Sequence, residues 1–211
     1  MCGIYGFTTK HPDIEKEEIL NQMGRTLRHR GPDQTGEYLG DNVAMGIERL
    51  SILDLKKGNQ PIFSNDDNFV IVHNGEVYNY KEIRKELQKK GYYFQTDTDT
   101  EVIVNLYQHK GMECLSELNG MFAFAIYDVR KKEIFVARDR FGIKPLYYLS
   151  ERTNFIFASE LKGVLAHPYV HPTISANAID LFLTMEFVPA PFTIYKEIKK
   201  LEQGHYLLWS R

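Results

Sequence analysis

The chain has 211 residues, of which 43% are hydrophobic and 26% are charged, an ordinary globular composition that predicts one compact domain with a sizeable core. A formal net charge of -2, without any Lys/Arg block, argues against nucleic acid or anionic lipid as a partner. No apolar stretch is long enough to cross a membrane and the N-terminus lacks a secretory signal pattern, so we expect a cytoplasmic protein with a small-molecule partner.

Hydrophobic periodicity predicts the elements of the first half of the chain. In chain order these are a helix over 15–27 that ends in the turn Arg30-Gly31-Pro32-Asp33, strands over 43–47 and 69–73, and helices over 81–90 and 100–110. Asn79 is the predicted N-cap of the second helix, and Gly91 and Gly111 are the predicted stops of the second and third. Helices and strands therefore come in groups.

The second half of the chain is richer in strands. The predicted elements are strands over 121–127, 134–137 and 155–158, a helix over 176–184 within a Pro-rich excursion at 167–191, and a final strand over 206–209. The run 121–127 is apolar at both alternating sets of positions, which indicates a strand covered on both faces. The short polar segment 128–133 predicts an antiparallel hairpin. Two packed sheets flanked by helices satisfy both observations.

Only two cysteines occur, Cys2 and Cys114, and their separation argues against a disulfide framework. Removal of Met1 gives Cys2 a free α-amino group, so that a nucleophile and a base lie on one residue. The amine has an ordinary pKa near 8 and the thiol one near 8.5, so the amine can accept the thiol proton near neutral pH. The alternative is that Cys2 is merely a small buried residue.

The surrounding segments decide between these two interpretations. The start Met1-Cys2-Gly3-Ile4-Tyr5-Gly6 resembles that of class II glutamine amidotransferases, whose glutaminase domains are N-terminal nucleophile hydrolases. Five further segments resemble the family in order and spacing: 28–33 (RHRGPD), 48–52 (ERLSI), 74–79 (NGEVYN), 96–101 (TDTDTE) and 138–147 (RDRFGIKPLY). Among the branches of the family, the forms at 49–52 and 74–79 most resemble glutamine-hydrolysing asparagine synthetases. The resemblance implies an α+β fold, a four-layer αββα sandwich of two mainly antiparallel sheets flanked by helices.

The resemblance also assigns the catalytic groups. Cys2 attacks the side-chain amide of glutamine, and the side-chain amide of Asn74 and the backbone N–H of Gly75 stabilise the oxyanion that forms. Loss of one such donor typically costs about 3 kcal/mol of transition-state stabilisation. In isolation the Asn74-Gly75 dipeptide also predicts a type I′ hairpin turn.

The same resemblance implies how glutamine is held. Arg49 grips the carboxylate with its planar fork, and Asp99 and Glu76 complement the ammonium. The wall of the pocket is formed by residues of the segment that follows Arg49, namely Leu50, Ser51, Ile52 and Leu53. Many relatives carry valine in place of Leu53, which affects the detail of the wall. Taken singly, each charged residue has a second interpretation as a surface charge, and Asp99 as the cap of the third helix.

Two further residue types are interpreted without catalytic roles. His29 lies in an arginine-rich turn that Arg28, Arg30 and Asp33 explain structurally, and the amine of Cys2 already supplies a base. The histidines and cysteines show no recognisable metal spacing, so no metal and no other cofactor is expected in this chain.

The expected organisation is a single glutaminase domain over 1–211. Asparagine synthetases carry a further domain that adenylates aspartate with ATP and receives ammonia. This chain contains neither that domain's Ser-Gly-Gly loop nor a phosphate loop, so ATP and Mg²⁺ are expected only for the absent synthetase domain. The expected partners are L-glutamine and an ammonia-accepting synthetase domain or subunit. The alternatives are the glutaminase domain of another class II branch, and a silent glutamine-binding domain in which Met1 is retained.

Overall fold

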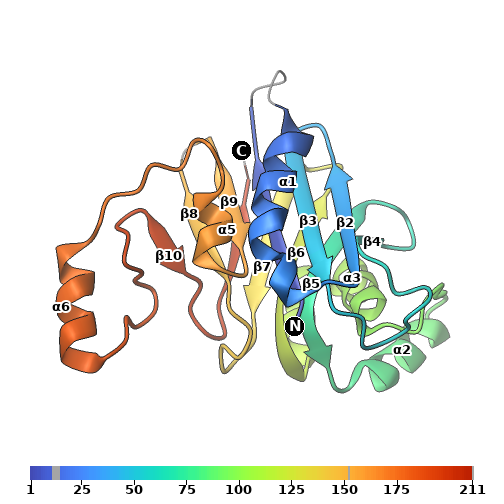
Figure 1. Cartoon of the computed structure of the whole chain (residues 1–211). Coiled ribbons are helices and arrows are strands. Elements are labelled where there is room, and N and C mark those ends of the chain that lie inside the picture. The colour runs from blue at the N-terminus through green and yellow to red at the C-terminus, as the bar shows by residue number, and fades with distance from the viewer. Residues whose placement is uncertain (11–14, 152, 211) are drawn as a thin grey trace.

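The computed structural model describes residues 1–10, 15–151 and 153–210. Within these residues, two antiparallel sheets of six and five strands pack face to face. Helices α1 (Lys16–Leu27) and α5 (Leu161–Leu165) cover the outer face of the first sheet, while α2 (Tyr80–Lys89) and α3 (Asp99–Lys110) cover that of the second (Figure 1). The predicted αββα sandwich is confirmed.

The first strand of the chain lies among the central strands of the first sheet. Its strands, in spatial order, are β10 (Ile198–Lys200), β8 (Tyr147–Ser150), β9 (Phe155–Ala158), β1 (Gly3–Thr8), β3 (Val43–Arg49) and β2 (Gln34–Leu39). Strand β1 is fully buried and pairs with β3 on one side and β9 on the other. Cys2 therefore immediately precedes a rigid central strand.

The second sheet contains the longest strand pairing among the described residues, that of its two central neighbours. Its strands, in spatial order, are β11 (Tyr206–Trp209), β7 (Glu133–Arg138), β6 (Gly120–Asp128), β5 (Phe69–Val77) and β4 (Ile62–Phe63). Along β6, Phe122, Phe124 and Ile126 face the helices, whereas the alternate residues Ala123 and Ala125 face the first sheet. The prediction of a strand buried on both faces is confirmed, as is the antiparallel hairpin from β6 to β7.

The helix starts show one error in the predictions. Asn79 does precede α2, but its side chain does not cap that helix. Its amide donates to the carbonyl of Glu117 at 2.8 Å and its carbonyl accepts from the N–H of Asn119 at 3.0 Å. Both ends of the side chain are thus used to hold the segment after α4 (Cys114–Glu117) against the start of α2.

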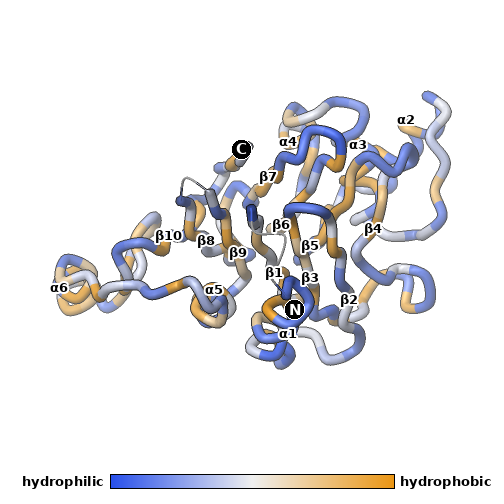
Figure 2. Tube along the Cα trace, turned by 90° about the horizontal axis from the view of Figure 1, so that it is seen from above, coloured by the Kyte–Doolittle hydropathy of each residue, from blue (hydrophilic) through white to orange (hydrophobic). Residues whose placement is uncertain are grey.

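The excursion at 167–191 begins against the sandwich, where His167 and Val170 are buried, and continues into α6 (Ala176–Met185), which Figures 1 and 2 both place at the edge of the molecule. Orange apolar positions follow the central strands in Figure 2 and also occur on α6. The exposed apolar side chains of this helix are Ile179, Phe182, Leu183 and Met185. No helix among the described residues is long and apolar enough to cross a membrane.

His167, just after α5, is buried against the first sheet and is expected to make stability depend on pH. Its ring packs edge-on against Phe7 with centroids 4.7 Å apart, and its Nε2 atom has no hydrogen-bond partner among the residues that the structure describes. Burial lowers the pKa of His167 from its ordinary value of 6.5 to about 4. Between these pH values the unfolded chain binds a proton that the folded chain does not, so stability falls as the pH drops from 6.5 towards 4.

The expected size of this effect is about 2 kcal/mol of unfolding free energy lost at pH 5 relative to pH 7. Urea unfolding of the wild type and of His167→Asn at both pH values measures it, because asparagine keeps a hydrogen-bond acceptor without titrating. The wild type should lose about 2 kcal/mol more than the variant. Equal losses in the two proteins would show that His167 is not the titrating group.

Candidate active site

A cavity of about 200 Å³ lies beside Cys2, at one end of the sandwich. Its walls come from six separate parts of the chain: the N-terminus, the end of β3 with the loop after it, β5, the start of α3, β6, and the loop between β7 and β8. Of the residues predicted from the resemblance, those that line it are Cys2, Arg49, Leu50, Ile52, Leu53, Asn74, Gly75, Glu76 and Asp99. Ser51 and His29 do not belong to the described lining.

The thiol of Cys2 is held against Leu50. Its Sγ atom accepts from the Leu50 N–H at 3.4 Å, and the S–H lies 3.5 Å from the Leu50 carbonyl oxygen. Arg30 Nε donates to the carbonyl of Cys2 at 2.9 Å, which fixes the backbone. Burial raises the pKa of the thiol, and the Leu50 N–H together with nearby positive charges opposes that shift. A buried thiol of this kind needs a base to become a nucleophile.

Asn74 and Gly75 lie within β5, opposite Ala123 and Phe122 of β6, so the hairpin-turn alternative is wrong. The Nδ2 atom of Asn74 is buried and has no hydrogen-bond partner within the described part of the chain. A buried amide donor without a partner is costly, and Asn74 lines the cavity, so this donor is a candidate for binding a ligand. A Cβ atom on Gly75 would lie 2.2 Å from the Met121 carbonyl oxygen. The glycine is therefore required by the close approach of β6.

Arg49 is only 3% exposed and ends β3. Its Nη2 atom donates to the carbonyls of Leu53 at 2.8 Å and Asp54 at 3.1 Å. Its Nη1 atom donates to Asn59 Oδ1 at 3.1 Å. The guanidinium thus binds the loop that forms part of the cavity wall, and Arg49 also lines the cavity itself. That Arg49 binds the carboxylate of a substrate stays a prediction.

The segment after Arg49 is fixed at a second point. The backbone N–H of Ser51 donates to Asp33 Oδ2 at 2.8 Å. Asp33 belongs to the turn that follows the 3₁₀ turn Arg28–Arg30. Ser51 therefore shapes the loop from outside the cavity.

Asp99 is the first residue of α3, and Thr98 is its N-cap, with Thr98 Oγ1 accepting from the Glu101 N–H at 3.2 Å. The alternative of Asp99 as the cap is therefore wrong. Asp99 Oδ2 accepts from the Val77 N–H at 2.8 Å, which ties α3 to the end of β5. Glu76, the neighbour of Val77, borders the same cavity. Two carboxylates thus lie on one wall, where they suit an ammonium.

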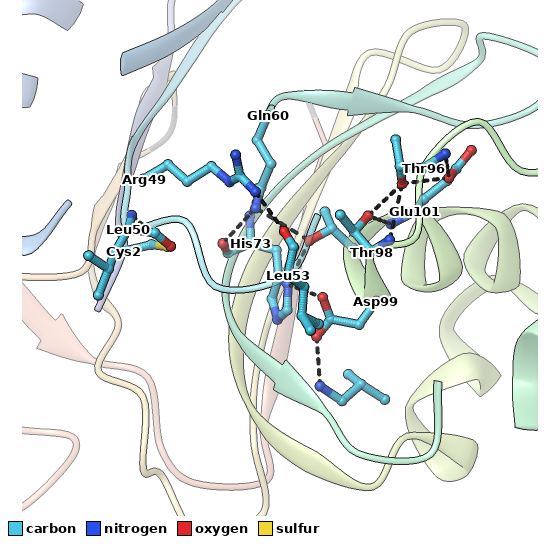
Figure 3. A network of polar contacts seen from close by, with 12 residues as sticks. Cys2, Arg49, Leu50, Leu53, Gln60, His73, Thr96, Thr98, Asp99 and Glu101 are labelled. Carbon is cyan, nitrogen blue, oxygen red and sulfur yellow. Dashed lines mark hydrogen bonds and ion pairs between the residues drawn. The ribbon is translucent and has the colours of Figure 1, made fainter. Parts of the chain in front are cut away.

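A buried polar network that the sequence did not predict supports this wall (Figure 3). His73 Nδ1 lies 3.0 Å from Thr100 Oγ1 and 4.0 Å from Asp99 Oδ1. Gln60 Oε1 accepts from the His73 N–H at 2.7 Å, and Gln60 Nε2 donates to Thr100 Oγ1 at 3.3 Å. Burial lowers the pKa of His73, and the charge of Asp99 opposes the shift. The network holds β5 against the start of α3.

A second group that sequence reasoning left without a role is Lys144. Its side chain lines the cavity, and its Nζ atom donates to the Met1 Sδ atom at 3.3 Å. The loop that carries it is organised by Asp139, whose carboxylate accepts from the N–H groups of Phe141, Ile143 and Lys144 at 3.1, 3.0 and 3.0 Å. Lys144 is therefore held in place by its backbone.

His29 is half exposed and its Nε2 atom lies 2.9 Å from Glu160 Oε1, which also accepts from Arg30 Nη1 at 2.8 Å. Although burial alone raises the pKa of Glu160, hydrogen bonds from Arg30, Lys162 and His29 lower it to about 2. The carboxylate thus fastens the turn around Arg30 to the segment after β9. Among the described residues, no group of three or more His, Cys, Asp or Glu side chains could hold a metal ion.

The structure places a cysteine beside the N-terminus, at the head of a central strand of an αββα sandwich. This is the arrangement that the resemblance to the glutaminase domains of N-terminal nucleophile hydrolases led us to expect. The whole chain, residues 1–211, matches the family model described as a glutamine amidotransferase domain, and the chain belongs to this family. The B. subtilis glutamine phosphoribosylpyrophosphate amidotransferase has the same fold, with a TM-score of 0.67 and 25% identity over 82% of this chain and 45% of that one.

The curated relatives that the chain matches include two asparagine synthetases. Over 207 residues the chain is 42% identical to asparagine synthetase [glutamine-hydrolyzing] 1 of Bacillus subtilis, covering 97% of this chain and 33% of that protein. Over 167 residues it is 43% identical to asparagine synthetase B [glutamine-hydrolyzing] of Escherichia coli, covering 78% of this chain and 30% of that protein. The chain thus spans about a third of the length of these relatives.

Proposed function

We propose that this chain, once Met1 is removed, hydrolyses L-glutamine to glutamate and ammonia through a thioester on Cys2. The observation that carries the proposal is that Cys2 and Asn74 line one cavity, and that the buried Nδ2 donor of Asn74 has no hydrogen-bond partner among the described residues. A nucleophile and a donor for the developing negative charge are the two parts that acyl transfer needs. Membership of the glutamine amidotransferase family supports glutamine as the substrate.

The chemistry follows from these groups. The α-amine of Cys2 takes the thiol proton, and Sγ bonds to the amide carbon while the carbonyl electrons move onto oxygen. Asn74 Nδ2–H and Gly75 N–H donate to that oxyanion. The carbonyl then re-forms, the C–N bond breaks, and the proton held by the amine leaves with nitrogen as ammonia. Water, deprotonated by the same amine, attacks the thioester, and collapse releases glutamate and returns a proton to Sγ.

The two charged ends of glutamine are matched by opposite charges on the cavity walls. Asp99 and Glu76 are proposed to hold the α-ammonium, and Arg49 the α-carboxylate. The Asp99–Val77 hydrogen bond at 2.8 Å and the buried His73–Thr100 contact at 3.0 Å keep the acidic wall rigid. A rigid wall orients the amide carbon towards Cys2 and reduces the entropy lost on reaching the transition state.

The wider proposal concerns the ammonia. The relatives named glutamine-hydrolysing asparagine synthetases are about three times the length that this chain covers. We propose that the ammonia serves a synthetase domain or subunit that makes asparagine from aspartate and ATP, and that ATP and Mg²⁺ belong to that part. The proposed compartment is the cytoplasm, supported by the free thiols of Cys2 and Cys114.

A second candidate function rests on Met1. In this structure Met1 lines the cavity and its sulfur accepts from Lys144 Nζ at 3.3 Å. A chain that keeps Met1 has no α-amine on Cys2 and would be a silent glutamine-binding domain. The glutaminase domain of another amidotransferase branch is the remaining alternative, and the B. subtilis phosphoribosylpyrophosphate amidotransferase supports it by its fold.

The test compares two preparations of the chain, one with Met1 removed and one with Met1 retained, as established by intact mass. Glutamate and ammonia formation from glutamine is measured for both. We expect steady turnover from the processed chain, none from the other, and a thioester adduct in acid-quenched samples of the processed chain alone. Glutamine binding without turnover by the processed chain would overturn the proposal in favour of the silent domain.

A further inference from the structure

Lys144 is a buried cation that the proposed glutaminase reaction does not use. It is only 6% exposed, yet among the described residues none of the ion pairs includes it. Its ammonium donates to the thioether sulfur of Met1, which is a weak acceptor. An ammonium removed from water without a carboxylate partner is costly, so its placement calls for a functional explanation.

The backbone of Lys144 is fixed on both sides. Its N–H donates to Asp139 Oδ2 at 3.0 Å and its carbonyl accepts from Arg138 Nε at 2.8 Å. Asp139 is fully buried and also accepts from the Phe122 N–H at 3.3 Å, which anchors the loop to β6. The side chain is therefore directed at the N-terminus by a rigid loop.

Removal of Met1 changes what this ammonium faces. The sulfur acceptor is lost, and the chain then begins at Cys2, whose thiol already feels the positive charge of Lys144. A positive charge near an amine disfavours protonation of that amine, and near a thiol it favours the thiolate. The first effect raises the fraction of molecules in which the amine is free to accept a proton, and the second stabilises the thiolate that remains after the transfer.

Other charges also act on Cys2. From the remaining elements that surround the cavity and the N-terminus, the charged or titratable groups are Arg30, Arg49, His73, Glu76 and Asp99. Arg49 is bound to loop carbonyls and Arg30 to Glu160, and the two carboxylates lie on the wall proposed to bind the substrate. Lys144 is thus the cation near Cys2 that has no carboxylate or carbonyl acceptor for its charge among the described residues.

We propose that Lys144 is a positioning residue which, after removal of Met1, keeps the α-amine of Cys2 unprotonated and so ready to accept the thiol proton. The inference rests on the proposed glutaminase function. It predicts that the charge of the side chain, more than its shape, sets the pH range in which the enzyme works.

The experiment uses the processed chain and three variants, Lys144→Met, Lys144→Arg and the control Lys85→Met. Lys85 is exposed on α2 and its loss changes the net charge by the same amount. The pH dependence of kcat/KM for glutamine is measured for each protein. In Lys144→Met the acidic limb should move to higher pH by about one unit, with an approximately tenfold loss at neutral pH that recovers in alkaline solution. Lys144→Arg and Lys85→Met should retain the wild-type profile.

A second readout separates failure of this inference from failure of the proposed function. The rate at which iodoacetamide alkylates Cys2 is followed by mass as a function of pH, and requires no turnover. Its midpoint should rise in Lys144→Met and in Lys144→Gln, which serves if the methionine variant does not fold. Superimposable profiles, an equal loss at every pH, or an arginine variant that behaves like the methionine variant would overturn the inference. Absence of turnover in the wild type with a shifted alkylation midpoint would count against the glutaminase function alone.

Discussion

Replacement of Cys2 by alanine is expected to abolish glutamine hydrolysis by the processed chain, with a loss in kcat of at least about four orders of magnitude. The thiol supplies the only bond to the acyl group in the proposed reaction, and the remaining donors can only orient water. The measurement is glutamate formation at saturating glutamine. Binding should survive the change, because the groups proposed to hold the ends of glutamine are untouched, and calorimetry with glutamine measures this.

Cys114 offers the matched control. It is fully buried in α4, and burial raises the pKa of its thiol to about 12, so it has no nucleophilic character near neutral pH. Cys114→Ala should lower stability by about 1 kcal/mol through lost packing and leave kcat unchanged. Turnover that persists in Cys2→Ala, or that disappears in Cys114→Ala while that variant remains folded, would contradict the assignment of the nucleophile.

The sequence was most informative where apolar residues form a continuous run or recur at a regular spacing. The run Met121-Phe122-Ala123-Phe124-Ala125 predicted a strand buried on both sides, and β6 is that strand. The helices at 15–27 and 176–184 were found from their apolar spacing to within a residue at each end. Such patterns are local, because each records only which side of an element is covered.

The central strand β1 was missed as an element for a physical reason. All six of its residues are buried, as most of β6 is, but two of the six are glycine, which weakens a strand signal that the apolar run of β6 retains. A Cβ on Gly6 would lie 2.6 Å from the Ala44 carbonyl oxygen, so this glycine serves close packing within the sheet. Glycine is needed at this position because of a residue that is distant in the sequence, so the neighbouring residues of β1 do not reveal the need.

The residues of the site also fall into two groups, those that the sequence alone could predict and those that it could not. Cys2, Asn74 and Asp99 stand in short motifs, so the sequence alone is enough to propose them. Gln60 and His73 could not be proposed in this way, because their function in the wall depends on contacts with each other and with α3 that link residues 13 and more positions apart. A motif read along the chain contains no information on such distant pairs. The signal that could have drawn attention to His73 is its place directly before Asn74 in a strand of otherwise apolar residues.

Replacement of Asn74 by alanine is expected to lower kcat for glutamine by a factor of about 10² to 10³, equivalent to about 3 to 4 kcal/mol, with little change in KM. The reason lies in the buried Nδ2 atom of Asn74, a residue that lines the cavity, because this atom has no hydrogen-bond partner among the described residues. Such a donor forms its bond when the oxyanion appears, so its loss affects the transition state more than the bound substrate. The Gly75 N–H remains and supports residual turnover. Steady-state kinetics on the processed chain provide both constants.

Asn105 in α3 supplies the comparison that isolates the chemistry. Its Nδ2 atom is also buried, with no partner in the described part of the chain, and its Oδ1 accepts from the Asn65 N–H at 2.9 Å, but Asn105 is not among the residues that line the cavity. Asn105→Ala should reduce the free energy of unfolding by about 1 to 3 kcal/mol, because a backbone donor loses its acceptor, and should leave kcat in place. If both alanine variants lost stability and neither lost kcat, the unpartnered amide of Asn74 would be a packing feature and the oxyanion would have to be held by backbone alone. A selective fall in kcat for Asn74→Ala would tie the buried donor to the transition state.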